Sequence, residues 1–351
     1  MAPKPSSSAT RRFLHLLIPD GNDGHTLHNI DTRPLFAAAA GAAACPHPQG
    51  PGPALPPKSM HHFPLPRPAL RFDYAHGHQF LPLGRDVSRI VAVDRNRHTV
   101  IYDTGTATVR AGPDVRHVKW YGSAWAEAGG RLYHLGRAPV LDELDDNPGL
   151  DFEALTYDPR REDWLWTLLP SPPFKNFSIA ADITSFADAG TGEETIRVST
   201  RCTQGTYAFD TARGTWREEG DWAMPFSGRA QYVADYGLWF GISDERNGDI
   251  CAADLAVTGR PEARHVWDDV DGLSGHGVSM YPWHLSYMGR GRFCVTRFFT
   301  GTDDNNRSIF KMAVVTAVEA TSAAGDGEMQ MARRASRCYR FPWHHSYCWA
   351  Y

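Results

Sequence analysis

A short pattern recurs along this chain, and it constrains the fold more than any other feature of the sequence. An aromatic residue precedes an aspartate, and in the two clearest copies a tryptophan follows six residues after the aspartate. A strand that ends at a polar turn and leads into a second, aromatic strand is a β-hairpin. Repeated hairpins indicate stacked or radially arranged sheets. The copies are Tyr157-Asp158 with Trp164, Phe209-Asp210 with Trp216 and, in weaker form, Tyr102-Asp103 and Asp254.

The repeated aspartates resemble a carboxylate array, but their position in the pattern favours a structural role. Aspartate at a turn accepts hydrogen bonds from the backbone amides that follow it. We therefore expect each of the four aspartates to cap its own turn. A large aromatic ring can fill the space between neighbouring sheets, and we expect Trp164 and Trp216 to pack there.

The hairpins predict an all-β fold. Short runs rich in β-branched and aromatic residues precede the aspartate turns, for example at 89–93 and 131–135, and long helical periodicity is absent. The predicted architecture is a single β-propeller with six four-stranded blades, and five or seven blades are the alternatives. A strand near 337–341 is expected to pair with the segment near Phe13 and so to close the propeller.

Three segments divide the chain. The propeller is expected to occupy residues 11–351, and residues 1–10 are expected to form a disordered tail. Residues 37–68 are rich in alanine and proline. Proline lacks a backbone donor and disrupts both helices and strand ladders, so we expect a flexible insertion there.

Composition limits the classes of partner and compartment. The net charge of −4 gives no general attraction to nucleic acid or to an anionic membrane. No apolar run reaches the roughly 18 residues that a membrane helix needs. The six cysteines form no C-x-x-C pair, which favours reduced thiols and a cytoplasmic or nuclear protein, with a Cys338–Cys348 disulfide left open. We expect a monomer.

Four arginines stand close together near the C-terminus. They lie in a segment with strand character, where a solvated strand face is the favoured interpretation and a phosphate site is the alternative. They are Arg333, Arg334, Arg337 and Arg340.

The aspartate-aromatic hairpins, together with the Gly129-Gly130 pair before Tyr133, resemble kelch repeats. The sequence departs from the kelch pattern in that only one unit has the glycine pair and only two units have the tryptophan. More closely, the chain resembles a plant family expanded in grasses, domain of unknown function 1668, over about residues 11–341. This resemblance implies a kelch-like propeller, no established activity and no catalytic residues. The phrases that carry it are Arg11-Arg12-Phe13-Leu14, Gly205-Thr206-Tyr207-Ala208-Phe209-Asp210-Thr211, Trp222-Ala223-Met224-Pro225-Phe226-Ser227-Gly228-Arg229-Ala230 and Cys251-Ala252-Ala253-Asp254-Leu255.

Strand order predicts which end of the blades binds a partner. The turns between third and fourth strands are short, whereas nearly all long loops fall at the opposite end, where binding is usual on a rigid scaffold. These loops are acidic with a few aromatic residues, which would suit a basic protein segment; ordinary solvated loops are the alternative. The candidate partner-binding residues are Asp142, Glu143, Asp145, Asp146, Phe174, Phe226, Arg229, Asp268, Asp269, Tyr281, Trp283, Asp303 and Asp304.

Catalytic and metal motifs are weak. His61-His62, His76-x-His78 and His344-His345-x-x-Cys348 lack the second matching motif of a closed zinc site. There is no nucleophile elbow, P-loop or dinucleotide fingerprint. We therefore expect no metal, cofactor or catalytic residue, and predict a non-enzymatic protein-interaction scaffold, with an adaptor-type role as one form of that function. The alternative is an enzyme, or a carbohydrate or small-molecule binder, that uses the central pocket of the propeller.

Overall fold

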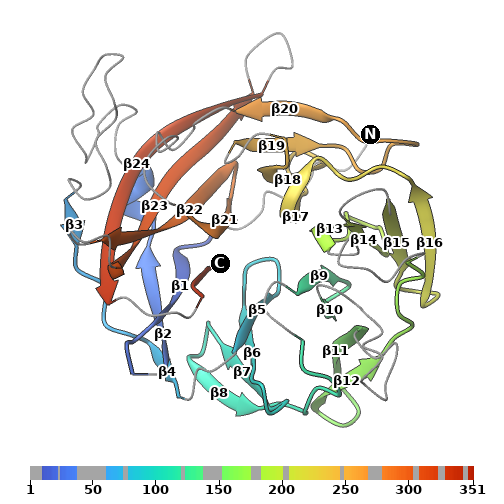
Figure 1. The fold of residues 1–351 in the computed structure, drawn as a ribbon, viewed down its shortest axis with the longest axis horizontal. Coiled ribbons are helices and arrows are strands. Elements are labelled where there is room, and N and C mark those ends of the chain that lie inside the picture. Colours follow the sequence, from blue (N-terminus) through green and yellow to red (C-terminus); the bar gives the residue numbers. More distant parts are fainter. Residues whose placement is uncertain are drawn as a thin grey trace. The chain divides into compact units, whose positions relative to one another are not determined.

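The computed structural model describes residues 10–22, 24–37, 61–73, 78–119, 123–136, 152–174, 183–200, 205–245, 249–267, 279–302, 308–322, 329–342 and 347–351 (Figure 1). Residues 1–9 of the predicted tail and most of the predicted insertion lie outside these ranges. The chain divides into two compact units. The first comprises residues 1–76, 248–250 and 267–351, and the second comprises residues 77–247 and 251–266.

The second unit consists of antiparallel four-stranded sheets whose strands follow one another in chain order. It holds β5 to β20, apart from Ile250 of β19 and Trp267 of β20. The strands are β5 (Gln79–Leu83), β6 (Arg89–Val93), β7 (Thr99–Asp103), β8 (Thr108–Ala111), β9 (Ala124–Ala128), β10 (Arg131–Leu135), β11 (Phe152–Asp158), β12 (Asp163–Leu168), β13 (Ile183–Ala187), β14 (Thr195–Thr200), β15 (Thr206–Asp210), β16 (Thr215–Gly220), β17 (Phe226–Val233), β18 (Leu238–Ser243), β19 (Ile250–Ala253) and β20 (Ala263–Trp267).

Burial falls from the first to the fourth strand of a sheet. Every residue of β5 is buried, whereas every residue of β8 is exposed. The first strands of two successive sheets, β13 and β17, pair in parallel, with Phe186 opposite Arg229. Four-stranded meanders with buried first strands are the blades of a β-propeller. The predicted all-β, propeller-type fold is therefore confirmed, whereas the number of blades and the kelch-specific features stay predictions.

The aspartates of the repeat cap their turns as expected. The Thr106 amide donates to Asp103 Oδ1 at 2.9 Å, and the Arg160 amide donates to Asp158 Oδ1 at 2.9 Å. In the other two turns the acceptors are Asp210, which binds the Ala212 and Arg213 amides, and Asp254, which binds the Ala256 amide. These carboxylates are held in local backbone bonds, so the repeat is a structural one. Of the aromatic residues in the repeat, Tyr102 and Phe209 are buried, while Tyr157 is 42% exposed.

The tryptophans of the repeat pack between neighbouring sheets. The Trp216 ring lies 5.3 Å from Phe152 of the preceding sheet and 5.0 Å from Phe209 of its own. Its Nε1 donates to the Pro170 carbonyl at 2.7 Å. Trp164 is buried, and the guanidinium of Arg89 in the preceding sheet lies 5.5 Å from its ring.

Removing the Trp216 ring should therefore weaken the fold. We expect Trp216→Ala to lower the free energy of unfolding by about 3 kcal/mol, because the contact between two sheets is lost. Trp216→Phe keeps the ring contacts and loses the bond to Pro170, so it should cost about 1 kcal/mol. Urea unfolding followed by circular dichroism measures both. Equal, near-zero effects would show that the two sheets do not depend on this contact.

The first unit contains two sheets and a short helix, α1 (Arg33–Ala37). One sheet has the order β25-β1-β2-β4 and the other has the order β21-β22-β23-β24-β3. The strands are β1 (Phe13–Pro19), β2 (His25–Asp31), β3 (His62–Phe63), β4 (Leu70–Phe72), β21 (Ser279–Gly289), β22 (Arg292–Thr302), β23 (Ser308–Ser322), β24 (Met329–Pro342) and β25 (Trp349–Ala350).

The C-terminus completes the N-terminal sheet, but through a different strand from the one predicted. β25 pairs with β1, with Ala350 opposite Leu16 (Figure 1). Residues 337–341 instead belong to β24, where Arg337 lies opposite Val315 of β23. The prediction was wrong because long apolar strands give a clear pattern, whereas a two-residue strand gives none.

Residues 222–225 lie between β16 and β17, outside any strand, although a tryptophan and a proline close together suggest the end of a strand. The fourth strand of this sheet is β16, which directly follows the Asp210 turn. Cys251, Cys294, Cys338 and Cys348 are buried free thiols, so the disulfide left open by the sequence is not formed.

Candidate binding groove

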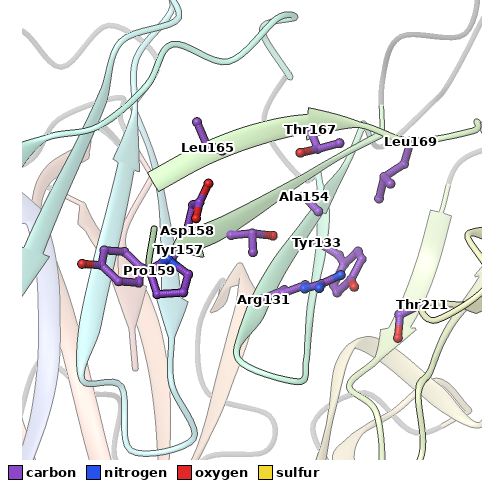
Figure 2. Close-up of a pocket in the computed structure, with 11 residues that line it drawn as sticks. Arg131, Tyr133, Ala154, Tyr157, Asp158, Pro159, Leu165, Thr167, Leu169 and Thr211 are labelled. Carbon is purple, nitrogen blue, oxygen red and sulfur yellow. The ribbon is translucent and has the colours of Figure 1, made fainter. Parts of the chain in front are cut away.

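An open groove of about 370 Å³ lies over one face of the sheet β9 to β12 in the second unit (Figure 2). Three strands of this sheet form its floor, and the turn after β15 in the next sheet contributes Thr211. The lining residues are Arg131, Tyr133, Ala154, Thr156, Tyr157, Asp158, Pro159, Leu165, Thr167, Leu169 and Thr211.

The groove follows from the alternation of side chains along strands. Residues two apart in a strand share a face, as do Ala154 and Thr156 in β11 and Leu165 and Thr167 in β12. The β11 residues at this face are small. They leave space beside the next sheet that a leucine or phenylalanine would fill.

The groove combines apolar and polar lining residues with a cation. The exposed Arg131 side chain forms no ion pair or hydrogen bond with any residue in the described part of the chain. Asp158 is already engaged by the Arg160 amide and lies 3.6 Å from Arg161 Nε, and the Thr211 hydroxyl donates to the Glu194 carbonyl at 2.8 Å. Arg131 is therefore the group most available to a ligand.

Strand β12 borders the groove and is an edge strand of its sheet. Within the described ranges its outer edge has no strand partner. Thr167 is exposed and Leu168 is 37% exposed. An unpaired strand edge offers backbone donors and acceptors to a further strand.

A second polar cluster joins the first strands of the sheets in the second unit. Asp188 Oδ1 accepts from the Glu127 amide at 3.0 Å, and Asp188 Oδ2 accepts from Arg229 at 2.6 Å. Glu127 Oε2 accepts from the Gly84 amide at 2.9 Å, and the Arg229 guanidinium lies 4.0 Å from the Trp125 ring. The cluster thus ties the ends of β5, β9 and β13 to β17.

The pKa of Glu127 is raised, first by burial and then by the charge of Asp188. Arg229 and the Gly84 amide oppose this shift. Both Asp188 oxygens and one Glu127 oxygen are already bonded within the protein. The cluster holds strands together and does not present a free carboxylate pair.

The structure places few of the predicted partner-binding residues on a common surface. Arg229 lies in the cluster described above, and Trp283 stacks with the Arg297 guanidinium at 3.8 Å. Phe174 and Phe226 are 3% and 0% exposed in the core of the second unit, so the expectation that they lie in exposed loops was wrong. Both flank prolines in the sequence, which suggested loops, but their rings fill gaps between strands. For Tyr281 the structure describes the backbone alone, in β21. Outside the described residues lie Asp142, Glu143, Asp145, Asp146, Asp268, Asp269, Asp303 and Asp304.

The groove residues were missed from the sequence, although a signal for them exists. Arg131 and Tyr133, like Thr156 and Asp158, follow a period of two in predicted strands. That period gives the shared face of a strand but does not tell which neighbour covers it. Only the position of the next sheet shows that this face stays open.

Two kinds of feature are absent from the described residues. No cluster of three or more His, Cys, Asp or Glu side chains there is arranged to hold a metal ion. No helix in that part of the chain has the length and apolar character needed to cross a membrane.

Comparison with solved structures gives matches of low sequence identity. The Kuenenia stuttgartiensis hydrazine synthase matches at 16% identity and a TM-score of 0.37, covering 72% of this chain and 64% of that one. This chain therefore spans less than two thirds of that match. The complex of KlAtg21 with the coiled-coil of AgAtg16 matches at 10% identity and a TM-score of 0.40, covering 94% of this chain and 82% of that one. The β-propeller domain of Myceliophteria thermophila Cps50 (Swd1) matches at 13% identity and a TM-score of 0.33, covering 73% of this chain and 86% of that one. The fold assignment rests on the strand order of the sheets.

Sequence comparison gives a family without a known activity. No protein of curated function matches the chain. The model of the protein family of unknown function DUF1668 matches residues 11–339, which is most of the chain and agrees with the resemblance in its sequence phrases. The chain belongs to the DUF1668 family.

Proposed function

We propose that this protein is a non-enzymatic interaction scaffold that binds an extended segment of a partner protein in the groove over β10, β11 and β12. The observation that carries the proposal is the groove itself: among the described residues the Arg131 guanidinium of β10 has no ion pair or hydrogen bond, and the outer edge of β12, two strands away in the same sheet, has no strand partner. A rigid sheet that presents such a groove needs little rearrangement to bind, which limits the entropic cost of association.

The groove fits a peptide better than a compact ligand. A segment in extended conformation can pair with the free edge of β12 through its backbone while alternate side chains enter the groove. Leu165 and Leu169 would contact an apolar side chain, and Arg131 would attract a carboxylate. We expect the preferred segment to carry an apolar residue and an acidic residue at nearby positions.

The alternative function uses a central pocket for catalysis or for a small molecule. The first-strand cluster of Glu127, Asp188 and Arg229 is the nearest observation to it. Because the Asp188 oxygens and the Glu127 carboxylate bind backbone amides and Arg229, their present arrangement supports cohesion of the sheets more than chemistry. The scaffold is therefore the preferred proposal. The acidic loops, such as those carrying Asp145 and Asp303, remain a separate candidate surface for a basic partner.

A peptide-display selection tests the groove. The full chain is used to select binders from a random peptide library, and the affinity of each is measured by fluorescence polarisation. Thr167→Arg should fill the groove and weaken selected peptides at least about tenfold, or about 1.4 kcal/mol. Val109→Arg is the matched control, because Val109 is a 50% exposed residue on β8, the corresponding strand of another sheet.

The outcomes separate the surfaces. Loss of binding in Thr167→Arg with retention in Val109→Arg supports the groove. Retention in both variants contradicts it. If binding is instead lost in the variant with lysine at Asp145, Asp146, Asp303 and Asp304, the acidic loops are the interaction surface.

A further inference from the structure

Three side chains of the groove over β10, β11 and β12 carry hydrogen-bond donors that no group in the described part of the chain engages. They are the guanidinium of Arg131 and the hydroxyls of Tyr133 and Thr156. All three groups can donate to an oxygen atom of a ligand. The carboxylate of Asp158, in contrast, already accepts from the Arg160 amide at 2.9 Å. The groove therefore presents unused donors, which suit a ligand rich in acceptors.

Strand geometry brings these three donors together. Arg131 and Tyr133 are two residues apart on β10 and so share a face, and Figure 2 shows their side chains beside each other. Tyr133 lies opposite Ala154 of β11. The same antiparallel register, continued by two residues, places Thr156 opposite Arg131. The side chains of Arg131, Tyr133 and Thr156 are called the donor cluster below.

The most informative member of the donor cluster is Tyr133. It is 3% exposed, and its ring lies 6.1 Å from the rings of both Phe152 and Phe209. A phenylalanine at this position would keep these ring contacts. A hydroxyl in so enclosed a place without a hydrogen-bond partner costs free energy. Its presence on the wall of an open groove indicates a group that binds a ligand.

The charges of the groove favour a ligand group with a single negative charge. A carboxylate matches one guanidinium, with which it forms two parallel hydrogen bonds. A phosphate monoester carries nearly two negative charges at neutral pH. Beside the single unpaired guanidinium of Arg131 it would retain uncompensated charge, and it would be repelled by Asp158 in the same groove. A carboxylate is therefore the better match.

The distance across the sheet favours a long acidic side chain. A segment paired with the outer edge of β12 lies three strand spacings from β10, or about 14 Å between backbones. The Arg131 side chain covers only part of this distance, so the ligand side chain has to cover the rest. Glutamate, which is one methylene longer than aspartate, is the better candidate.

We propose that the donor cluster determines the specificity of the groove by binding the carboxylate of a glutamate in the partner segment. This inference rests on the proposed function, since it concerns the same groove. Arg131 forms the ion pair, and the hydroxyls of Tyr133 and Thr156 donate to the lone pairs of the carboxylate that the guanidinium leaves free. Arg131 and Tyr133 thus distinguish an acidic residue from its neutral amide.

Four synthetic peptides test the proposal by fluorescence polarisation with the full chain. In the first peptide, of ten residues, valine alternates with serine and one central valine is replaced by glutamate, so that the glutamate shares a face with the other valines. The other three carry glutamine, aspartate or phosphoserine at that position. The wild type should bind the glutamate peptide at least about tenfold more tightly than the glutamine peptide. Arg131→Gln and Tyr133→Phe should each remove most of this preference.

Matched controls remove the same chemical groups elsewhere in the second unit. Arg260 is exposed and Tyr102 is 2% exposed, and neither lines the groove. Arg260→Gln and Tyr102→Phe should keep the preference for glutamate. Tyr133→Phe should leave the midpoint of urea unfolding unchanged, because the lost hydroxyl has no partner in the described part of the protein. A purely structural role of that hydroxyl would lower the midpoint.

The proposal is overturned if the glutamate peptide does not bind, or if its preference survives in Arg131→Gln and Tyr133→Phe. It is also overturned if the aspartate or phosphoserine peptide binds as tightly as the glutamate peptide. Failure of the groove itself gives a different result, in which Thr167→Arg weakens none of the peptides. If Thr167→Arg weakens all four peptides and the wild type shows no preference for glutamate, the groove is supported and the donor cluster is not.

Discussion

Replacing Lys119 with methionine is expected to lower the free energy of unfolding by about 3–5 kcal/mol, because it leaves a buried carboxylate without its counterion. Lys119 Nζ lies 2.5 Å from Glu153 Oε2, and both side chains are fully buried. The Arg116 amide also donates to Glu153 Oε1 at 2.8 Å, so the carboxylate joins the segment after β8 to the start of β11. Without Lys119, Glu153 keeps this bond but loses the charge that offsets its desolvation.

Two controls show whether burial is the cause. The double change of Lys119→Met with Glu153→Leu removes both charges, so it should recover part of the lost stability. An exposed pair of the second unit, Arg110 with Asp163, has side chains 47% and 54% exposed. Arg110→Ala should therefore cost at most about 1 kcal/mol. Urea unfolding measures all three variants, and a loss below about 1 kcal/mol in Lys119→Met would contradict the predicted role.

Stability is expected to fall as the pH drops from about 6.5 to about 4, because several histidines are buried in the neutral form. Burial lowers the pKa of His15 to about 4, with a further contribution from the charge of Arg11. Burial lowers the pKa of His284 to about 4 as well, opposed by a bond to the Cys348 backbone. His134, between Gln79 and Ser123, is also shifted well below its usual value by burial.

The direction of the effect follows from proton binding. Between about pH 4 and 6.5 the unfolded chain protonates these histidines and the folded protein does not, so acid favours unfolding. Each fully shifted histidine contributes about 3 kcal/mol, which is present near neutral pH and lost as the pH falls through that window. The raised pKa of Glu127 acts in the opposite direction, since its protonated form is favoured by folding.

A single substitution checks this assignment. His15→Gln retains a side chain that can bond to Asn29, whose Oδ1 lies 2.8 Å from His15 Nδ1. The variant should take up about one proton fewer on unfolding in this pH range, so its stability should depend less steeply on pH. Urea unfolding at a series of pH values measures the slope. An unchanged slope in His15→Gln would mean that this histidine is protonated in the folded protein.

Several parts of the fold were predictable because their causes are local. The strands at 89–93 and 131–135 coincide with β6 and β10, since β-branched and aromatic runs next to polar turns favour strands whatever surrounds them. The aspartate caps were predictable for the same reason. Asp103 and Asp210 bond to amides two and three residues away, so no distant part of the chain is needed.

The candidate surfaces were harder to predict, because each depends on what lies opposite a strand. The sequence places Arg131 on a strand and Arg337 in a basic cluster. It does not identify the residues that would lie opposite these side chains and pair with them. Phe174 and Phe226 illustrate the same limit, since both were expected at a surface and both fill the core. Whether a side chain faces solvent is decided by elements far away in the chain.

The sequence by itself therefore determined the all-β class, the aspartate-capped hairpins and the positions of many strands, because these depend on residues within a few positions of one another. Only the tertiary structure decided the pairing of Ala350 with Leu16 and of Lys119 with Glu153. It also decided which face of the sheet β9 to β12 stays open. These features depend on contacts between residues distant in the chain, where burial and the match of charge and shape select one partner among many.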